Sequence, residues 1–133
     1  MDAATLQKQI DAMFPGSMGV KLVEISQEKV LAKMVVRRDL CTSGEALHGG
    51  AFMAFADTLG AMGTVVNMPQ GARTTTIESK TNFVGGAPLG TTVTGESTPL
   101  HRGRTTQVWQ TKITNDKGKL LAVVTQTQMI LPA

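Results

Sequence analysis

The segment from Gly49 to Val66 reads GGAFMAFADTLGAMGTVV, and it decides the architecture. If this segment is a helix, its apolar side chains cover the whole circumference, so protein must surround it. Its length also suggests a membrane span, but Asp57 in the middle, the dense glycines and the flanking strand patterns argue against that alternative. We therefore expect a central helix over residues 49–66, enclosed by the rest of the chain.

The segments on both sides of this helix show strand patterns. Before it, we expect an amphipathic helix over 3–14, ended by Pro15-Gly16, and then strands at Val20–Ile25 and Lys29–Arg37. After it, the pattern predicts strands at about 73–84, 91–100, 104–114 and 119–131. An antiparallel sheet needs an apolar layer against its inner face, and only the segment 49–66 has that character. The prediction is one α+β domain over 1–133, an antiparallel sheet wrapped around a central helix.

Composition narrows the function classes. The 133 residues carry a formal charge of +3 and no basic stripe interleaved with aromatics, so a nucleic-acid partner is not expected. One cysteine, Cys41, allows no intrachain disulfide and suits a reducing compartment. The first residues lack the pattern of a signal peptide, so we expect a cytoplasmic protein without a membrane partner. His48 and His101 lie far apart and no Cys/His cluster has ligand spacing, so no metal site is expected.

Asp57 is the most informative single residue. It lies among apolar neighbours in the expected helix, and burying a charge without partners costs several kcal/mol. Two interpretations remain open for it. Either the carboxylate is hydrogen-bonded into the core as a structural group, or it performs chemistry.

The triplet His48-Gly49-Gly50 lies where a loop becomes the expected helix. Its glycine amides belong to the unpaired N–H groups of a helix start, and a ligand atom can approach them closely. This arrangement suits the oxygen of a carbonyl that gains negative charge during acyl transfer. The alternative is a glycine pair needed for helix–sheet packing, with His48 as a cap.

The spacing of His48 and Asp57 relates these two features. Nine residues of helix separate them by roughly 13 Å and about half a turn, so they cannot meet within one chain. If both serve one reaction centre, Asp57 comes from a second subunit, with two central helices antiparallel across a twofold axis. The small, glycine-rich face of the helix would permit that approach. We therefore expect a homodimer with two composite sites. The pairing of two such dimers into a homotetramer is a separate expectation that does not follow from this spacing.

The stretch His48-Gly-Gly-Ala-Phe-Met-Ala-Phe-Ala-Asp57 resembles the His-Gly-Gly…Ala-Asp signature of hotdog-fold thioesterases, in the phenylacetate-degradation and hydroxybenzoyl-CoA thioesterase-like branch. The likeness in element order covers nearly the whole chain. It implies a hotdog fold and the hydrolysis of small acyl-CoA thioesters, aryl or medium-chain, with no cofactor beyond the CoA of the substrate.

The resemblance also implies roles for individual residues. Asp57 would activate a water or attack the thioester carbonyl, while the Gly49 N–H would hold the carbonyl oxygen and His48 would orient that region. Thr75 falls where relatives carry a hydroxyl near the carboxylate, although it is also an ordinary strand former. Thr42 replaces the Asn or Gln that positions water in the family, and Ala61 replaces a hydroxyl residue of some relatives.

The CoA half of the substrate carries phosphates, which call for cations and free amides. Arg102 and Arg104 are the best-placed basic pair, and Gly50, Gly85 and Gly86 offer backbone groups. The alternative is that Arg102-Gly103-Arg104 is only a solvated hairpin turn. Two other functions also remain open for the whole chain, a hotdog dehydratase acting on hydroxyacyl thioesters and a non-catalytic acyl-CoA-binding protein.

Overall fold

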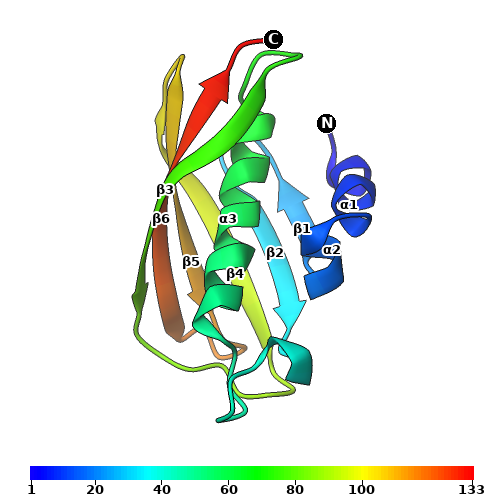
Figure 1. Cartoon of the computed structure of the whole chain (residues 1–133), viewed down its shortest axis with the longest axis vertical. Coiled ribbons are helices and arrows are strands. Elements are labelled where there is room, and N and C mark those ends of the chain that lie inside the picture. Colours follow the sequence, from blue (N-terminus) through cyan, green and yellow to red (C-terminus); the bar gives the residue numbers. More distant parts are fainter.

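The computed structural model describes all 133 residues as a sheet packed against one long helix (Figure 1). The helices are α1 (Ala3–Asp11), α2 (Phe14–Met18) and α3 (Gly49–Val65), with a short 3₁₀ turn at Arg38–Leu40. The strands are β1 (Lys21–Ile25), β2 (Val30–Val35), β3 (Arg73–Phe83), β4 (Thr92–Arg102), β5 (Thr106–Thr114) and β6 (Leu120–Leu131). The α+β prediction of an antiparallel sheet around a central helix is confirmed.

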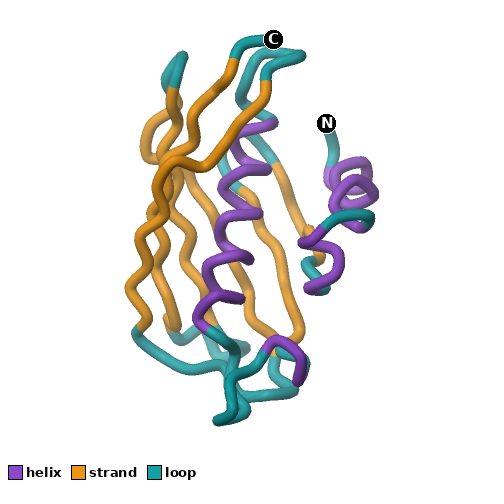
Figure 2. The backbone as a smooth tube through the Cα atoms, in the orientation of Figure 1, coloured by secondary structure: helices purple, strands orange, loops and turns teal.

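All strand pairs are antiparallel, in the order β1-β2-β4-β5-β6-β3. The strand that follows α3 therefore pairs with the last strand and forms one edge of the sheet. In Figure 1, β3 passes across α3, whereas α1 and α2 lie beside β1 at the other edge. The backbone trace in Figure 2 shows the same curvature of the sheet around the helix. No helix of the structure is long and apolar enough to cross a membrane.

The central helix meets the sheet through its glycines. A Cβ added to Gly60 would lie 2.3 Å from the Gln126 side chain, and one added to Gly63 would lie 2.6 Å from the ring of Trp109. These two glycines therefore let the sheet approach α3. The expectation that the glycine-rich face admits a second helix is wrong for Gly60 and Gly63, because their face is already occupied.

The first predicted helix is in fact two helices. The segment α1 ends at Asp11, and α2 begins at Phe14 with Pro15 in its first turn, where a missing N–H removes no hydrogen bond. The prediction that Pro15-Gly16 ends the helix is therefore wrong. The helix α2 ends at Gly19, whose φ of 84° is a left-handed conformation that glycine adopts without strain.

Candidate functional site

The first turn of α3 is capped by His48. Its Nδ1 accepts a hydrogen bond from the Gly50 N–H at 2.8 Å, so a neutral imidazole carries its proton on Nε2. The Gly50 amide is therefore occupied and does not meet the expectation of a free ligand-binding N–H. The Gly49 N–H has no hydrogen-bond partner in the chain. Only Gly49 supplies the open amide that an oxyanion site requires.

The loop before this turn is held by its own hydrogen bonds. The His48 N–H donates to the Leu40 carbonyl at 2.9 Å, and the Thr42 N–H donates to the Ala46 carbonyl at 2.8 Å. The Thr42 hydroxyl accepts from the Gly44 N–H at 3.3 Å. Thr42 thus lies in the loop beside His48, with its hydroxyl engaged in the turn 42–46.

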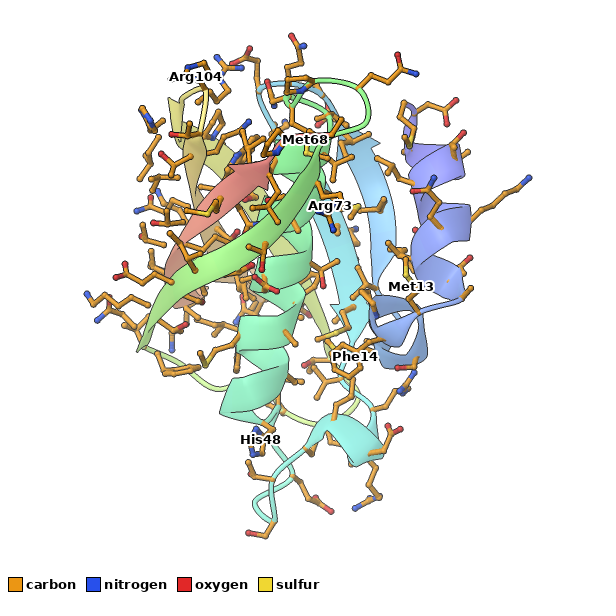
Figure 3. The ribbon with its side chains drawn as sticks, turned by 45° about the horizontal axis from the view of Figure 1, so that its top comes forward. Met13, Phe14, His48, Met68, Arg73 and Arg104 are labelled. Atoms are coloured by element: carbon orange, nitrogen blue, oxygen red, sulfur yellow. The ribbon has the colours of Figure 1, made fainter.

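A hollow of ≈ 400 Å³ opens beside this first turn. Its lining comes from α2, the 3₁₀ turn and α3: Phe14, Ser17, Met18, Arg37, Asp39, Leu40, Cys41, His48, Gly50, Ala51 and Ala54. Figure 3 shows Phe14 and His48 on neighbouring elements at this end of the molecule. Asp57 does not line the hollow.

The charged groups of the hollow neutralise each other. Arg37 donates from Nε to Asp39 at 3.0 Å and from Nη2 to the Ser17 carbonyl at 2.7 Å. The hydrogen bond from Arg37 lowers the pKa of the Asp39 carboxyl below its usual value, with a smaller charge–charge contribution from the same residue. The hollow is therefore mainly apolar, with a paired rather than a free cation in its wall.

The carboxylate of Asp57 is half-buried and has polar partners. The Thr76 hydroxyl donates to its Oδ1 at 2.5 Å, and Gln126 Nε2 donates to the same oxygen at 3.1 Å. Oδ2 accepts no hydrogen bond within the chain. β3 and β6 bring these polar groups to α3, so the carboxylate is hydrogen-bonded, as one of the two interpretations of the sequence expected.

The hydroxyl that was expected beside the Asp57 carboxylate from Thr75 is supplied within the chain by Thr76. Thr75 is exposed, because neighbouring residues of β3 face opposite sides of the sheet. Within the chain, the hydroxyl beside the carboxylate therefore belongs to Thr76, one residue from the position that the resemblance implied. Because α3 is a continuous helix, Asp57 lies roughly 13 Å from His48 along the axis, and the two do not meet in one chain.

The two arginines expected at a phosphate site differ in their surroundings. Arg102 Nη1 bonds Glu28 at 3.0 Å and the Gln27 carbonyl at 3.1 Å, so Arg102 ties β4 to the turn between β1 and β2. Arg102 is also the last residue of β4 rather than part of a turn. Arg104 makes no such bond and borders a second hollow of ≈ 270 Å³. In Figure 3, Arg104 lies at the opposite end of the molecule from His48.

The glycines after β3 also differ. The Gly85 N–H donates to the Leu121 carbonyl at 3.0 Å, and a Cβ at Gly85 would lie 2.9 Å from Leu121. Gly85 is therefore used in packing. Gly86 has open space around its Cβ position and an N–H without a partner, so it remains available to a ligand.

Several site groups have no counterpart among the residues selected from the sequence: Phe14, Met18, Arg37, Asp39, Thr76, Gln126 and Gln128. One signal for the glutamines exists, since Gln126 and Gln128 lie on the same face of β6 and the other residues of that face are apolar. No group of three or more His, Cys, Asp or Glu side chains is arranged to hold a metal ion.

Comparisons with known proteins show to which family the chain belongs. The family model of the thioesterase superfamily matches residues 44–122. A candidate esterase of Vibrio cholerae is 32% identical over 100 residues, which span 75% of this chain and 66% of that relative. A 1,4-dihydroxy-2-naphthoyl-CoA hydrolase of Escherichia coli is 29% identical over 116 residues, or 87% of this chain and 85% of its own.

Solved structures of thioesterases have a fold similar to that of this chain. A mutant thioesterase of Pseudomonas aeruginosa superposes with a TM-score of 0.95 at 25% identity, over 100% of this chain and 96% of its own. The matched residues include the start of α3, Asp57 and its partner Thr76, and they end before Gln126 on β6. This chain therefore belongs to the thioesterase superfamily, and the hotdog fold and the hydrolase class expected from its sequence are confirmed at the level of that family.

Proposed function

We propose that the protein hydrolyses thioesters of CoA with small, uncharged acyl groups, aryl or medium-chain. The observation that carries this proposal is the open Gly49 N–H at the start of α3, beside a largely apolar hollow of ≈ 400 Å³. A carbonyl oxygen bound at that amide would have its acyl group directed into the hollow. Pockets of this size and character accommodate small organic groups.

The reaction needs a base that the first turn of α3 does not supply. The Gly49 N–H stabilises the oxyanion that forms when water adds to the carbonyl carbon. Asp57 of a second subunit accepts the proton from that water through its free Oδ2. The C–S bond then breaks, CoA leaves as the thiolate and takes up a proton, and the free acid remains.

The composite site requires a homodimer, and two surfaces support that assembly. The edge strand β3 is unpaired along one side and exposes Ile77, which is 54% accessible. The neighbouring face of α3 is only half-buried along Met53, Asp57 and Ala61, which follow one another at i, i+4 and i+8. A second copy related by a twofold axis would pair the β3 edges and cover this face.

Release of free CoA tests the activity. Benzoyl-, phenylacetyl- and octanoyl-CoA should each release CoA to a thiol-reactive dye, and succinyl-CoA should be a poor substrate because Asp39 already pairs with Arg37. Asp57→Asn should lower kcat by about 10²–10⁴ with little change in KM. If Asp57→Asn keeps its kcat, Asp57 is not the base of the reaction, and if no acyl-CoA releases CoA, the proposed hydrolysis is wrong. The latter result would favour the dehydratase or the acyl-CoA-binding protein.

Mixed subunits test the composite site. His48→Ala and Asp57→Asn chains, each inactive alone, should form heterodimers that contain one intact and one doubly altered site. After random exchange about a quarter of all sites are intact, so about a quarter of wild-type activity should return. No recovery after exchange demonstrated by differently tagged chains would refute the intersubunit site.

A further inference from the structure

A polar network lies between α3 and the inner face of the sheet. We define the Asp57 network as Asp57, Thr74, Thr76, Gln126 and Gln128. Gln126 is 0% and Gln128 is 1% exposed, so both amides are removed from water. Buried amides cost free energy unless they are hydrogen-bonded, and apolar residues would pack the same space without that cost.

The donors of this network can be assigned from its geometry. Gln126 Nε2 lies 3.0 Å from Gln128 Oε1, 3.1 Å from Asp57 Oδ1 and 3.3 Å from the Asp57 carbonyl oxygen, so one of its two protons goes to Gln128 and the other to Asp57. Gln128 Nε2 donates to the Thr74 hydroxyl oxygen at 3.0 Å. The Thr76 hydroxyl lies 2.5 Å from both Asp57 Oδ1 and Gln128 Oε1, and we assign its single proton to Asp57, the charged acceptor.

The orientation of the Gln126 amide is fixed by Asp57. The reversed amide would turn Oε1 toward the carboxylate and toward Gln128 Oε1, which are both acceptors. In the observed orientation Gln126 Oε1 is buried without any partner. A buried acceptor without a partner costs free energy. The Gln126 amide bears this cost in the orientation that lets it donate to Asp57.

Gly60 provides the space for this amide. A Cβ on Gly60 would lie 2.3–2.6 Å from the terminal atoms of Gln126 and would displace them. Those atoms form the far end of a flexible side chain, so the displacement would move the amide rather than the backbone. Gly60 therefore controls the contact between Gln126 and Asp57 without touching the carboxylate.

We propose that Gln126, seated against Gly60, and Thr76 are positioning residues that hold the Asp57 carboxylate by Oδ1. Two donors on one oxygen fix the plane of the carboxylate and leave Oδ2 open on the half-buried face of α3. This inference rests on the proposed function, because it assigns the two residues to the geometry of the base. It predicts that they affect the chemical step more than substrate binding.

A double-mutant cycle on Gly60 and Gln126 tests the proposal. With the acyl-CoA that wild-type protein hydrolyses fastest, Gly60→Ala and Gln126→Ala should each lower kcat about 10- to 100-fold, while KM changes less than about 3-fold. The double variant should be no slower than the slower single variant, because Gly60→Ala acts only by moving Gln126. Fully additive losses, or losses confined to KM, would overturn the proposal.

A burial-matched control is available on β5. Gln107 is 1% exposed and lies opposite Gln128 in the β5–β6 ladder, but its side chain accepts a hydrogen bond from Trp109 Nε1 and makes none in the Asp57 network. Gln107→Ala should lower the thermal midpoint and leave kcat within about 3-fold of wild type. If it lowers kcat as much as Gln126→Ala does, the loss reflects general damage to the buried sheet face. The positioning role is then rejected.

The Asp57→Asn background separates the two proposals. In that background Gln126→Ala should cause no further loss of kcat, because the group it positions is gone. Undiminished kcat in Asp57→Asn refutes the role of Asp57 as the base in the proposed function, whereas a low kcat there with an active Gln126→Ala refutes only the positioning role. If Gln126→Ala does not fold, the near-isosteric Thr76→Val removes the other donor. Thr76→Val should then show the same selective loss of kcat.

Discussion

The two ends of α3 contain similar residues but meet very different surroundings. At the first turn, Gly49 has an unpartnered N–H and Gly50 is exposed beside a hollow. Further along, Gly60 and Gly63 are buried against side chains of the sheet. The same residue type therefore provides access for a ligand at one end and close packing at the other. What faces a glycine determines its role, and its mere presence in a helix does not.

The largest expected effect comes from the packed half. In Gly63→Ala the new methyl group would lie 2.6–2.7 Å from the ring of the fully buried Trp109, which has no space to move. Overpacking of this kind lowers the free energy of unfolding by about 1–3 kcal/mol. Gly50→Ala meets only the movable His48 ring, so its effect should stay below about 1 kcal/mol. Urea unfolding of both variants measures these changes in unfolding free energy. Equal losses in the two variants would show that the two ends of α3 do not differ in how tightly their glycines are packed.

The second prediction separates capping from chemistry at the first turn. His48→Ala removes the acceptor for the Gly50 N–H and should cost about 1 kcal/mol of unfolding free energy. His48→Asn supplies another good cap and should restore most of that stability. We expect neither variant to regain full CoA release. Should His48→Asn recover both stability and activity, His48 is a cap alone.

The third prediction compares Arg102 with Arg104, at the far end of α3. Arg102→Ala breaks a partly exposed ion pair with Glu28 and should cost less than about 1 kcal/mol, with no change in KM. Arg104 has no internal partner, and we propose that it contacts CoA phosphate. Arg104→Ala should raise KM for acyl-CoA several-fold but not for an acyl-pantetheine. An equal rise with both substrates would argue against phosphate binding.

The smallest effect is expected from Asp39 at the hollow. Its pKa is lowered in the folded state by the hydrogen bond from Arg37. The stabilisation is therefore complete above the ordinary value of 3.8 and is lost as the pH falls through the folded value. The stability difference between wild type and Asp39→Asn should shrink between pH ~5 and pH ~2. A difference that stays constant over that range would exclude the ion pair as its cause.

The fold was largely predictable because its signals are local. The all-round apolar segment 49–66 and the alternating strands required one helix against one sheet, and observed bounds differ from the expected ones by only a few residues. The prediction of one helix where α1 and α2 lie was wrong for a physical reason. Pro15 is compatible with both the end of one helix and the first turn of the next, and only packing decides between them.

The site was less predictable because its partners come from distant strands. His48, Gly49 and Asp57 follow from one helix, but Thr76 and Gln126 reach Asp57 through the pairing of β3 with β6. The expectation for Thr75 rested on the resemblance, and because neighbouring strand residues face opposite sides, Thr76 and not Thr75 lies beside Asp57 within the chain. The different roles of Arg102 and Arg104 likewise depend on the ion pair between Arg102 and Glu28, and no local sequence pattern links Glu28 to β4.

The pairing of β3 with β6 has a consequence for how the chain folds. The ladder that holds Thr76 and Gln126 near Asp57 runs from the pair Arg73 and Leu131 to the pair Phe83 and Ala122, so it joins residues that are far apart in the sequence. Closing such long loops costs entropy before any contact compensates for it, and folds of this kind form slowly. During synthesis, α3 and β3 emerge before their partner strand β6 exists. Until β6 is made, both edges of β3 lack a partner within the chain, and the outer edge with Ile77 remains exposed even after β6 pairs with the inner one.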